Sequence, residues 1–241
     1  MIDFFRLYCI AYLLGLLVAI GITVCAMAVS ITIGTFAAQA RDSRYLAVRT
    51  SVGAYVAAFR AVPPLLTLYF VYFGLPTWAA NSDMPLLAEF LKPLDNRVIS
   101  AVVAFALTSG AFTTEIIRSG IKSVGSDQVE AARSIGMSSG MIFRRVIAPQ
   151  AFRIAFPPLG SEFIYVLKGT SLASVIGVVE LMRTAQLAAG ATFQSLTAYG
   201  LAGLYYLLFV ALLQLSISRG EAFLSRGQRQ SANASTGRAA A

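Results

Sequence analysis

Residues 7–38 read LYCIAYLLGLLVAIGITVCAMAVSITIGTFAA and contain no charged side chain. About 20 apolar residues suffice for one helix to cross the hydrocarbon core of a bilayer, so this run is long enough for a tilted span. Ala26-Met27-Ala28 looks like a signal-peptidase site. The apolar sequence continues past it, however, and the apolar part of a signal peptide is much shorter. We therefore expect a long membrane-spanning helix that is retained.

The composition of the whole 241-residue chain agrees with a membrane environment, because 57% of the residues are hydrophobic and only 12% are charged. Histidine is absent and there are two cysteines, which removes the usual ligands of structural metals and the usual general base. The formal net charge of +8 is not gathered into a basic stripe interleaved with aromatic residues. We expect no metal, no cofactor, no covalent chemistry and no nucleic-acid partner.

Four further apolar runs bring the expected number of spans to five. Arg60 and Pro63-Pro64 interrupt the second span, and the prolines kink or start a helix there. Thr113 and Thr114 can extend the short third span, because their hydroxyls can bond to the helix backbone. The four runs are residues 54–78, 98–112, 159–179 and 196–217.

Lysine and arginine gather in the loops on one side, and the positive-inside rule places that side in the cytoplasm. These residues are Arg41, Arg44, Arg49, Arg60, Arg118, Lys122, Arg133, Arg144, Arg145, Arg153, Arg219, Arg226, Arg229 and Arg238. The amino terminus is then outside and the carboxyl terminus inside. We expect an all-α integral membrane protein with a transmembrane domain over residues 1–224. Residues 225–241 are rich in small and polar side chains and predict a disordered cytoplasmic tail.

The longest polar segment, residues 115–156, falls on the cytoplasmic side and has the chemistry of helices rather than of a linker. Asp127 can cap a short helix with Glu130 as its third residue, and Gly136 is placed to end that helix in a left-handed conformation. Ser138 can cap a second helix over residues 139–147, which is expected to end near Pro149. Such a loop suits a docking partner; the alternative is an interfacial helix resting on lipid headgroups.

The motif within this loop resembles a known signature. Glu130-Ala131-Ala132, then Gly136, then Val146, Ala148 and Pro149 are similar to the EAA motif of permease subunits of bacterial ABC importers. In that family the loop is a coupling helix seated in a groove of the ATPase subunit. The resemblance therefore implies a type I ABC importer permease fold and gives Glu130, Ala131, Ala132, Gly136 and Pro149 a role in ATPase coupling.

Five other segments narrow the resemblance to polar amino acid permeases of the histidine, glutamine, arginine and octopine type. They are residues 59–63, 72–76, 114–121, 167–172 and 175–181. The sequence departs from the family pattern where Ala61-Val62 replaces Gly-Thr, where Ser119 replaces a glycine and where Gly169 replaces a frequent aspartate.

Ionisable side chains at bilayer depth are expensive and indicate function by default. Glu162 is the first of these, and we expect it to line a midplane cavity with Thr170 and Ser171 and to bind the amino or other cationic group of a substrate. A glutamate occupies the matching place in permeases of octopine and basic amino acids. The alternatives are an interhelical pair or a place near the cytoplasmic mouth that water reaches.

Four other charged residues are expected to hold the structure or its gate rather than the substrate. Lys168 lies six residues after Glu162 and points about 120° away from it on a regular helix. Glu115 and Arg118 suit an ordinary pair at a helix end. The four residues are Arg60, Glu115, Arg118 and Lys168.

The expected function is that of a permease subunit of an ATP-driven importer for polar or cationic amino acids in the bacterial inner membrane. No Gly-x-x-x-x-Gly-Lys-Ser/Thr motif occurs, so ATP must be bound by partners. The resemblance implies two ATPase subunits, a second permease copy or a sister subunit, and an external substrate-binding protein, with alternating access driven by the ATPases.

Three alternatives remain at this point. The chain could be an ABC permease for another small polar solute. An ion-coupled secondary transporter would require an inverted repeat and acidic residues in several spans, and neither is evident. A membrane scaffold subunit would leave the polar cluster from Lys168 to Ser171 unexplained.

Overall fold

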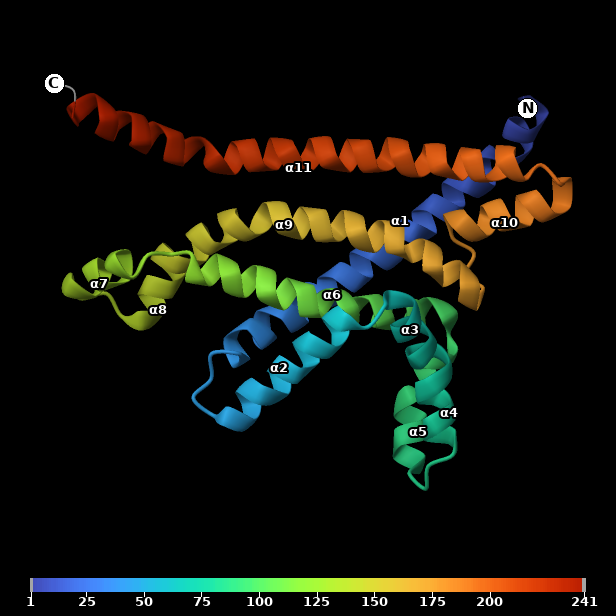
Figure 1. The fold of residues 1–241 in the computed structure, drawn as a ribbon, viewed down its shortest axis with the longest axis horizontal. Coiled ribbons are helices and arrows are strands. Elements are labelled where there is room, and N and C mark those ends of the chain that lie inside the picture. Colours follow the sequence, from blue (N-terminus) through green and yellow to red (C-terminus); the bar gives the residue numbers. More distant parts are fainter. Residues whose placement is uncertain (1, 240–241) are drawn as a thin grey trace. The chain divides into compact units, whose positions relative to one another are not determined.

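The computed structural model describes residues 2–239, with the side chains of residues 8–224. Throughout the described range the regular elements are helices (Figure 1). In chain order they are α1 (Ile2–Ala40), α2 (Leu46–Ala61), α3 (Pro64–Tyr69), η1 (Phe70–Gly74), α4 (Leu75–Ala80), α5 (Pro85–Leu91), η2 (Lys92–Asp95), α6 (Arg97–Lys122), α7 (Ser126–Ser134), α8 (Ser139–Ile142), η3 (Phe143–Ile147), α9 (Ala148–Gly169), η4 (Thr170–Ile176), α10 (Leu181–Thr192) and α11 (Ser195–Ala239). The all-α prediction is confirmed for these residues.

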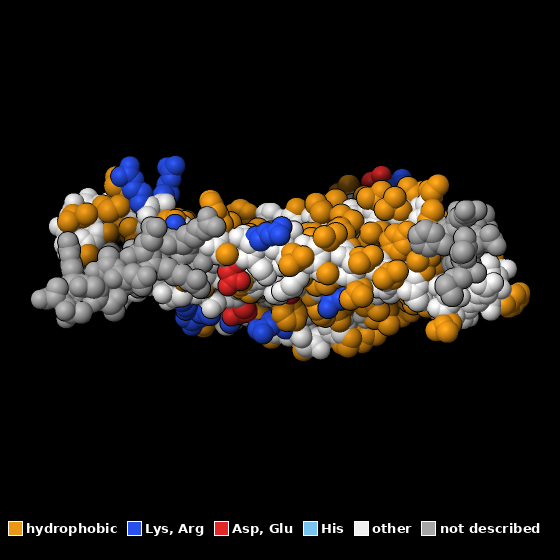
Figure 2. Space-filling view, turned by 90° about the horizontal axis from the view of Figure 1, so that it is seen from above, with side chains coloured by type: hydrophobic (Ala, Val, Ile, Leu, Met, Phe, Trp, Pro, Cys, Tyr) orange, Lys and Arg blue, Asp and Glu red, His pale blue; other side chains and the backbone are white. Residues whose placement is uncertain are grey.

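Three helices in the described range are long and apolar enough to cross a membrane, or five if each of two bent pairs counts as one span. The three are residues 8–40, 97–122 and 195–224. Hydrophobic side chains cover much of the surface in Figure 2, and Lys and Arg side chains stand out around α7 and α8. The predicted tail falls within the end of α11, but its side chains lie outside the described residues, so the tail as a separate segment stays a prediction.

The first bent pair confirms the interruption expected at the two prolines. Val62 adopts an extended conformation with ψ 130°, as the residue before a proline prefers, and α2 ends there. Pro64 starts α3, where a missing amide donor costs nothing. The two segments of the pair are bent by 110°.

Helix α1 presents one buried stripe to the core of the unit formed by Met1–Glu115 and Glu162–Phe209. Tyr12, Leu16, Ala19, Ala26 and Ser30 are buried at helical spacing along it. The side chain of Tyr12 is 0% exposed, and its hydroxyl donates to the backbone oxygen of Ala198, 186 residues later in the chain, at 2.9 Å. The core of this unit thus joins segments that are far apart in the sequence.

The second bent pair is the predicted fourth span in altered form. Rather than ending near Val179 as one helix, the chain turns at Gly177, whose φ is 83°, and restarts as α10 at an angle of 48°. Glu180 caps α10: its carboxylate accepts from the amides of Met182 and Arg183, each at 2.8 Å, and from the hydroxyl of Tyr206 at 3.2 Å. Because Glu180 is 0% exposed, these bonds stabilise a helix start that water cannot reach.

Candidate functional site

The start of α7 differs from the expectation. The residue before the helix is Gly125, the helix begins at Ser126, and no side chain caps it, so the prediction that Asp127 is the cap was wrong. Asp127 lies in the first turn and its Oδ1 is close to Gly125. A carboxylate in a first turn still interacts favourably with the helix dipole, which explains why the sequence pattern resembles a cap.

The end of α7 agrees with the sequence. Gly136 has φ 81°, the left-handed conformation expected of it. Its amide donates to the oxygen of Arg133 at 2.9 Å, and the amide of Met137 donates to the oxygen of Ala132 at 3.1 Å. Only a glycine adopts this conformation without strain. The prediction that Gly136 ends the helix is confirmed.

Helix α7 buries one side and exposes the other. Ala132 is 6% exposed, whereas Glu130 and Ala131 are exposed. The side chain of Gln128 accepts from Nε2 of Gln150 in α9 at 2.7 Å, which fixes α7 against α9. The structure therefore holds the carboxylate of Glu130 on the outside of an anchored helix.

Ser138 caps α8 as predicted, since its Oγ accepts from the amide of Met141 at 3.4 Å. The expected end near Pro149 is wrong, because the chain passes through the π-turn η3 and continues as α9 to Gly169. In this wider turn the amide of Ala148 donates to the oxygen of Phe143, five residues earlier. Pro149 then falls in the first turn of α9, where its ring and its missing amide are tolerated.

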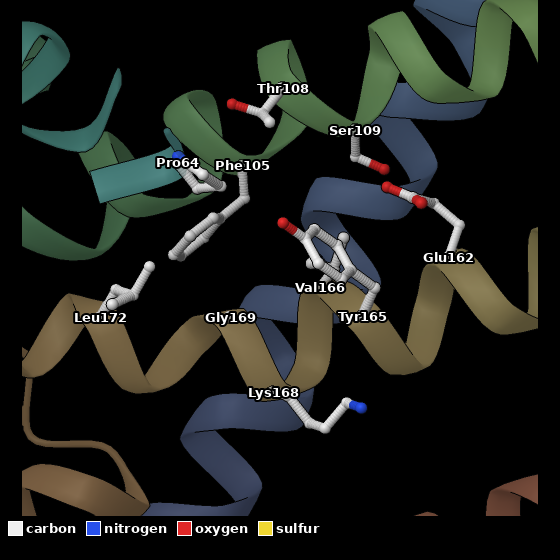
Figure 3. A pocket seen from close by; sticks show the side chains of 10 residues that line it. All are labelled: Pro64, Phe105, Thr108, Ser109, Glu162, Tyr165, Val166, Lys168, Gly169 and Leu172. Carbon is white, nitrogen blue, oxygen red and sulfur yellow. The ribbon is translucent and has the colours of Figure 1, made fainter. Parts of the chain in front are cut away.

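A cavity of about 210 Å³ lies between α6 and α9 in the unit formed by Met1–Glu115 and Glu162–Phe209. Figure 3 shows Ser109 of α6 and Glu162 of α9 pointing toward one another at this cavity. The hydroxyl of Ser109 interacts with the carboxylate of Glu162. The residues that line the cavity are Pro64, Phe105, Thr108, Ser109, Glu162, Tyr165, Val166, Lys168, Gly169 and Leu172.

Two buried polar atoms at this cavity have no hydrogen-bond partner within the part of the chain that the structure describes. They are Oε1 of Glu162 and Oγ1 of Thr108. A buried acceptor without a partner costs about 1–3 kcal/mol, and more when it is charged. A ligand that donates hydrogen bonds would remove that cost.

Thr170 and Ser171 do not line this cavity, contrary to the expectation for them. The hydroxyl of Thr170 donates to the oxygen of Leu167 at 2.7 Å and that of Ser171 to the oxygen of Lys168 at 2.8 Å. Hydroxyls in a helix often bond back to their own turn in this way. Ser171 instead lines a second cavity, of about 460 Å³, together with Lys168 and Tyr206.

Of the four other charged residues, Lys168 also lines the cavity at Glu162, but it points away from Glu162 in Figure 3 and forms no ion pair with any side chain that the structure describes. The guanidinium of Arg60 lies 5.3 Å from the ring centre of Phe112. Glu115 lies 3.7 Å from Arg41. Arg118 is half-buried near the end of α6.

Three residues of these sites were missed at the level of sequence: Thr108, Ser109 and Glu180. Thr108-Ser109-Gly110 is a polar run inside an otherwise apolar span, and that run was the signal for the cavity. Glu180 stands three residues after Gly177, and an acid shortly after a glycine is a signal for a new helix start. This signal was overlooked because Glu180 directly follows the apolar run of residues 159–179, which was taken as one continuous span.

Comparisons with known proteins place the chain among transport components. Residues 30–230 match the family described as binding-protein-dependent transport system inner membrane component. The chain is 35% identical to the nopaline transport system permease protein NocQ of Agrobacterium fabrum, over 89% of this chain and 91% of the relative. It is 38% identical to the L-cystine transport system permease protein TcyB of Bacillus subtilis, over 71% and 68% of the two chains.

A solved structure is similar over most of the chain as well. The crystal structure of an amino acid ABC transporter with histidines gives a TM-score of 0.77 at 30% identity, covering 89% of this chain and 94% of the other. The MetNI methionine ABC transporter in an inward-facing conformation gives a TM-score of 0.67 at 16% identity, which indicates a common fold.

Proposed function

Because the chain belongs to the family of binding-protein-dependent transport system inner membrane components, we propose that it forms the substrate pathway of an ATP-driven importer for cationic amino acids. The chain is an inner-membrane permease subunit of an amino acid ABC importer, with the type I permease fold, and not an enzyme. Its relatives are permeases for nopaline, octopine and cystine.

The membrane arrangement of the proposal has five spans, with the amino terminus outside and the carboxyl terminus inside. Three long apolar helices and two bent pairs support this number. The basic residues around α7 and α8 support a cytoplasmic loop. Two permeases, identical or paired with a sister subunit, would then enclose the pathway, with two ATPase subunits below and a substrate-binding protein outside.

The α7–α8 segment is the proposed contact with the ATPase. The exposed carboxylate of Glu130, the small exposed Ala131 and the buried Ala132 give a rigid helix with one polar contact surface. Closure of the ATPase pair on ATP would draw the two α7 helices together and open the pathway outward. Hydrolysis would reverse the movement, which is alternating access by rigid bodies.

The proposed substrate site is the cavity at Glu162, and the observation that carries it is the unpartnered, buried Oε1 of that residue. An ammonium or guanidinium group donates several hydrogen bonds and neutralises the carboxylate, so it fits this atom and the neighbouring Oγ1 of Thr108. Thr170 and Ser171 are left out of this site because their hydroxyls bond locally.

The test is ATP-dependent uptake of arginine and of citrulline by the complete transporter in proteoliposomes. Citrulline has nearly the shape of arginine but is neutral, so the ratio of the two rates isolates charge. Glu162→Gln should lower that ratio at least about tenfold, because a charge-assisted bond is lost. Glu89→Gln, at an exposed glutamate on α5, is the control and should leave the ratio unchanged. An unchanged ratio in Glu162→Gln would remove the substrate role.

A further inference from the structure

A chain of buried hydroxyl groups lies behind Glu162. Oγ of Ser30 in α1 is 3.1 Å from Oγ of Ser109 in α6 and 2.8 Å from Oγ1 of Thr113, also in α6. Ser30 and Thr113 are 0% exposed and Ser109 is 1% exposed. These three hydroxyls satisfy one another where water is excluded, and at one end Ser109 faces Glu162 at the cavity.

The chemistry of the carboxylate fixes the direction of this chain. An ionised carboxylate only accepts, so the interaction with Glu162 requires Ser109 to direct its single hydroxyl proton toward that carboxylate. Ser109 also lies 3.4 Å from Sδ of Met27, but a thioether is a much weaker acceptor. The oxygen of Ser109 then accepts from Ser30, and the oxygen of Ser30 accepts from Thr113. In this arrangement all three protons are directed toward the carboxylate.

We propose that Thr113, Ser30 and Ser109 form a directed hydroxyl chain that holds Glu162 ionised and oriented, and that this chain makes the cavity select cationic over neutral amino acids. Ser109 is a positioning residue in this proposal, since it acts through Glu162. The inference rests on the proposed role of Glu162 as the substrate's receptor.

The physical reason is the cost of a charge away from water. A carboxylate in a membrane-spanning segment is expensive unless donors compensate it, and without them it takes up a proton. Aligned hydroxyls polarise one another, so the last bond of the chain is stronger than an isolated one. A protonated Glu162 would lose its attraction for a cation and would accept a neutral ligand equally well.

The chain offers a matched pair of variants on adjacent residues. Thr113 and Thr114 are both 0% exposed, but the hydroxyl of Thr114 donates to the oxygen of Gly110 at 2.7 Å, within its own helix. Thr113→Val removes a member of the chain, whereas Thr114→Val removes a buried hydroxyl outside it. Valine keeps the methyl group of Thr113, which packs closely against Gly34.

The experiment measures binding of arginine and citrulline to the complete permease–ATPase complex in nanodiscs, without the external binding protein. We expect Ser109→Ala to lower the arginine-to-citrulline preference about tenfold and Thr113→Val about threefold, with Thr114→Val unchanged. Thr113→Ser retains the hydroxyl and should retain the preference. In a Glu162→Gln background, Ser109→Ala should have no further effect, because the chain then has no charge to support.

The outcomes separate this inference from the proposed function. A wild-type preference in both Ser109→Ala and Thr113→Val, with the preference lost in Glu162→Gln, would overturn the hydroxyl chain and leave the role of Glu162 intact. Equal losses in Thr113→Val and Thr114→Val would also overturn it, since they would indicate a general packing defect. A preference that survives Glu162→Gln would overturn both.

Discussion

The α7–α8 loop and the Glu162 cavity are both rich in polar residues, but they are built in opposite ways. The loop is stabilised by bonds between near neighbours in sequence, such as those of Gly136 to Arg133 and Met141 to Ser138, and it exposes Glu130. The cavity is lined by residues far apart in the sequence, such as Ser109 and Glu162, and the hydroxyls beside it are also joined over long stretches of chain: 83 residues separate Ser30 from Thr113. A site for a protein partner can be local, whereas a site inside a helical bundle must be assembled by packing.

The largest effect is expected when the charge of Glu130, on the exposed side of the α7–α8 loop, is reversed. Glu130→Arg should reduce transport and stimulation of the ATPase at least about tenfold, as loss of a central interface contact does, while membrane insertion is unchanged. Uptake and ATPase rates in proteoliposomes measure the effect. Glu89→Arg, at another exposed glutamate, is the control. Normal coupling in Glu130→Arg would mean that α7 does not meet the ATPase.

A second test asks whether the left-handed conformation of Gly136 stabilises the α7–α8 loop. Gly136→Ala forces a side chain into a left-handed conformation at a cost of about 1–2 kcal/mol. Gly140→Ala in α8 meets no atom within 4 Å and should be neutral or slightly stabilising. Hydrogen–deuterium exchange of residues 126–142 should speed up about tenfold in Gly136→Ala and not in Gly140→Ala. The same rate in both would show that the glycine conformation does not hold the loop.

The smallest expected effect is at the cap of α8. Ser138→Ala removes the bond to the amide of Met141 and should cost about 1 kcal/mol, so exchange in α8 should rise about fivefold. Ser139→Ala changes the next serine, which is not the cap, and should leave exchange near its normal rate. If exchange changed equally in the two variants, the distinction between capping and ordinary surface serines in this loop would fail.

The difference between the regions also explains what the sequence could predict. Gly136, Ser138 and Pro63-Pro64 each act on the backbone within a few residues of themselves, and the structure agrees with the expectation for each. The two errors in the loop concern boundaries. An acid in the first turn was taken for a cap, and the widened turn before Pro149 lets a helix continue where a regular one would stop.

The cavity was only partly predictable. Glu162 was found because a carboxylate in an apolar run is unusual, and the structure places it at a cavity. Its partners could not be derived, because Ser109 lies 53 residues earlier and sequence periodicity does not specify which helices pack together. Thr170 and Ser171 were assigned to the cavity by proximity in sequence, but their hydroxyls are used by their own backbone.

The bond from Tyr12 to Ala198 has a consequence for biogenesis. The acceptor oxygen of Ala198 is made 186 residues after Tyr12, so the phenol of Tyr12 in α1 lacks this partner until the start of α11 has been synthesised. A product truncated before Ala198 therefore lacks this contact between α1 and α11.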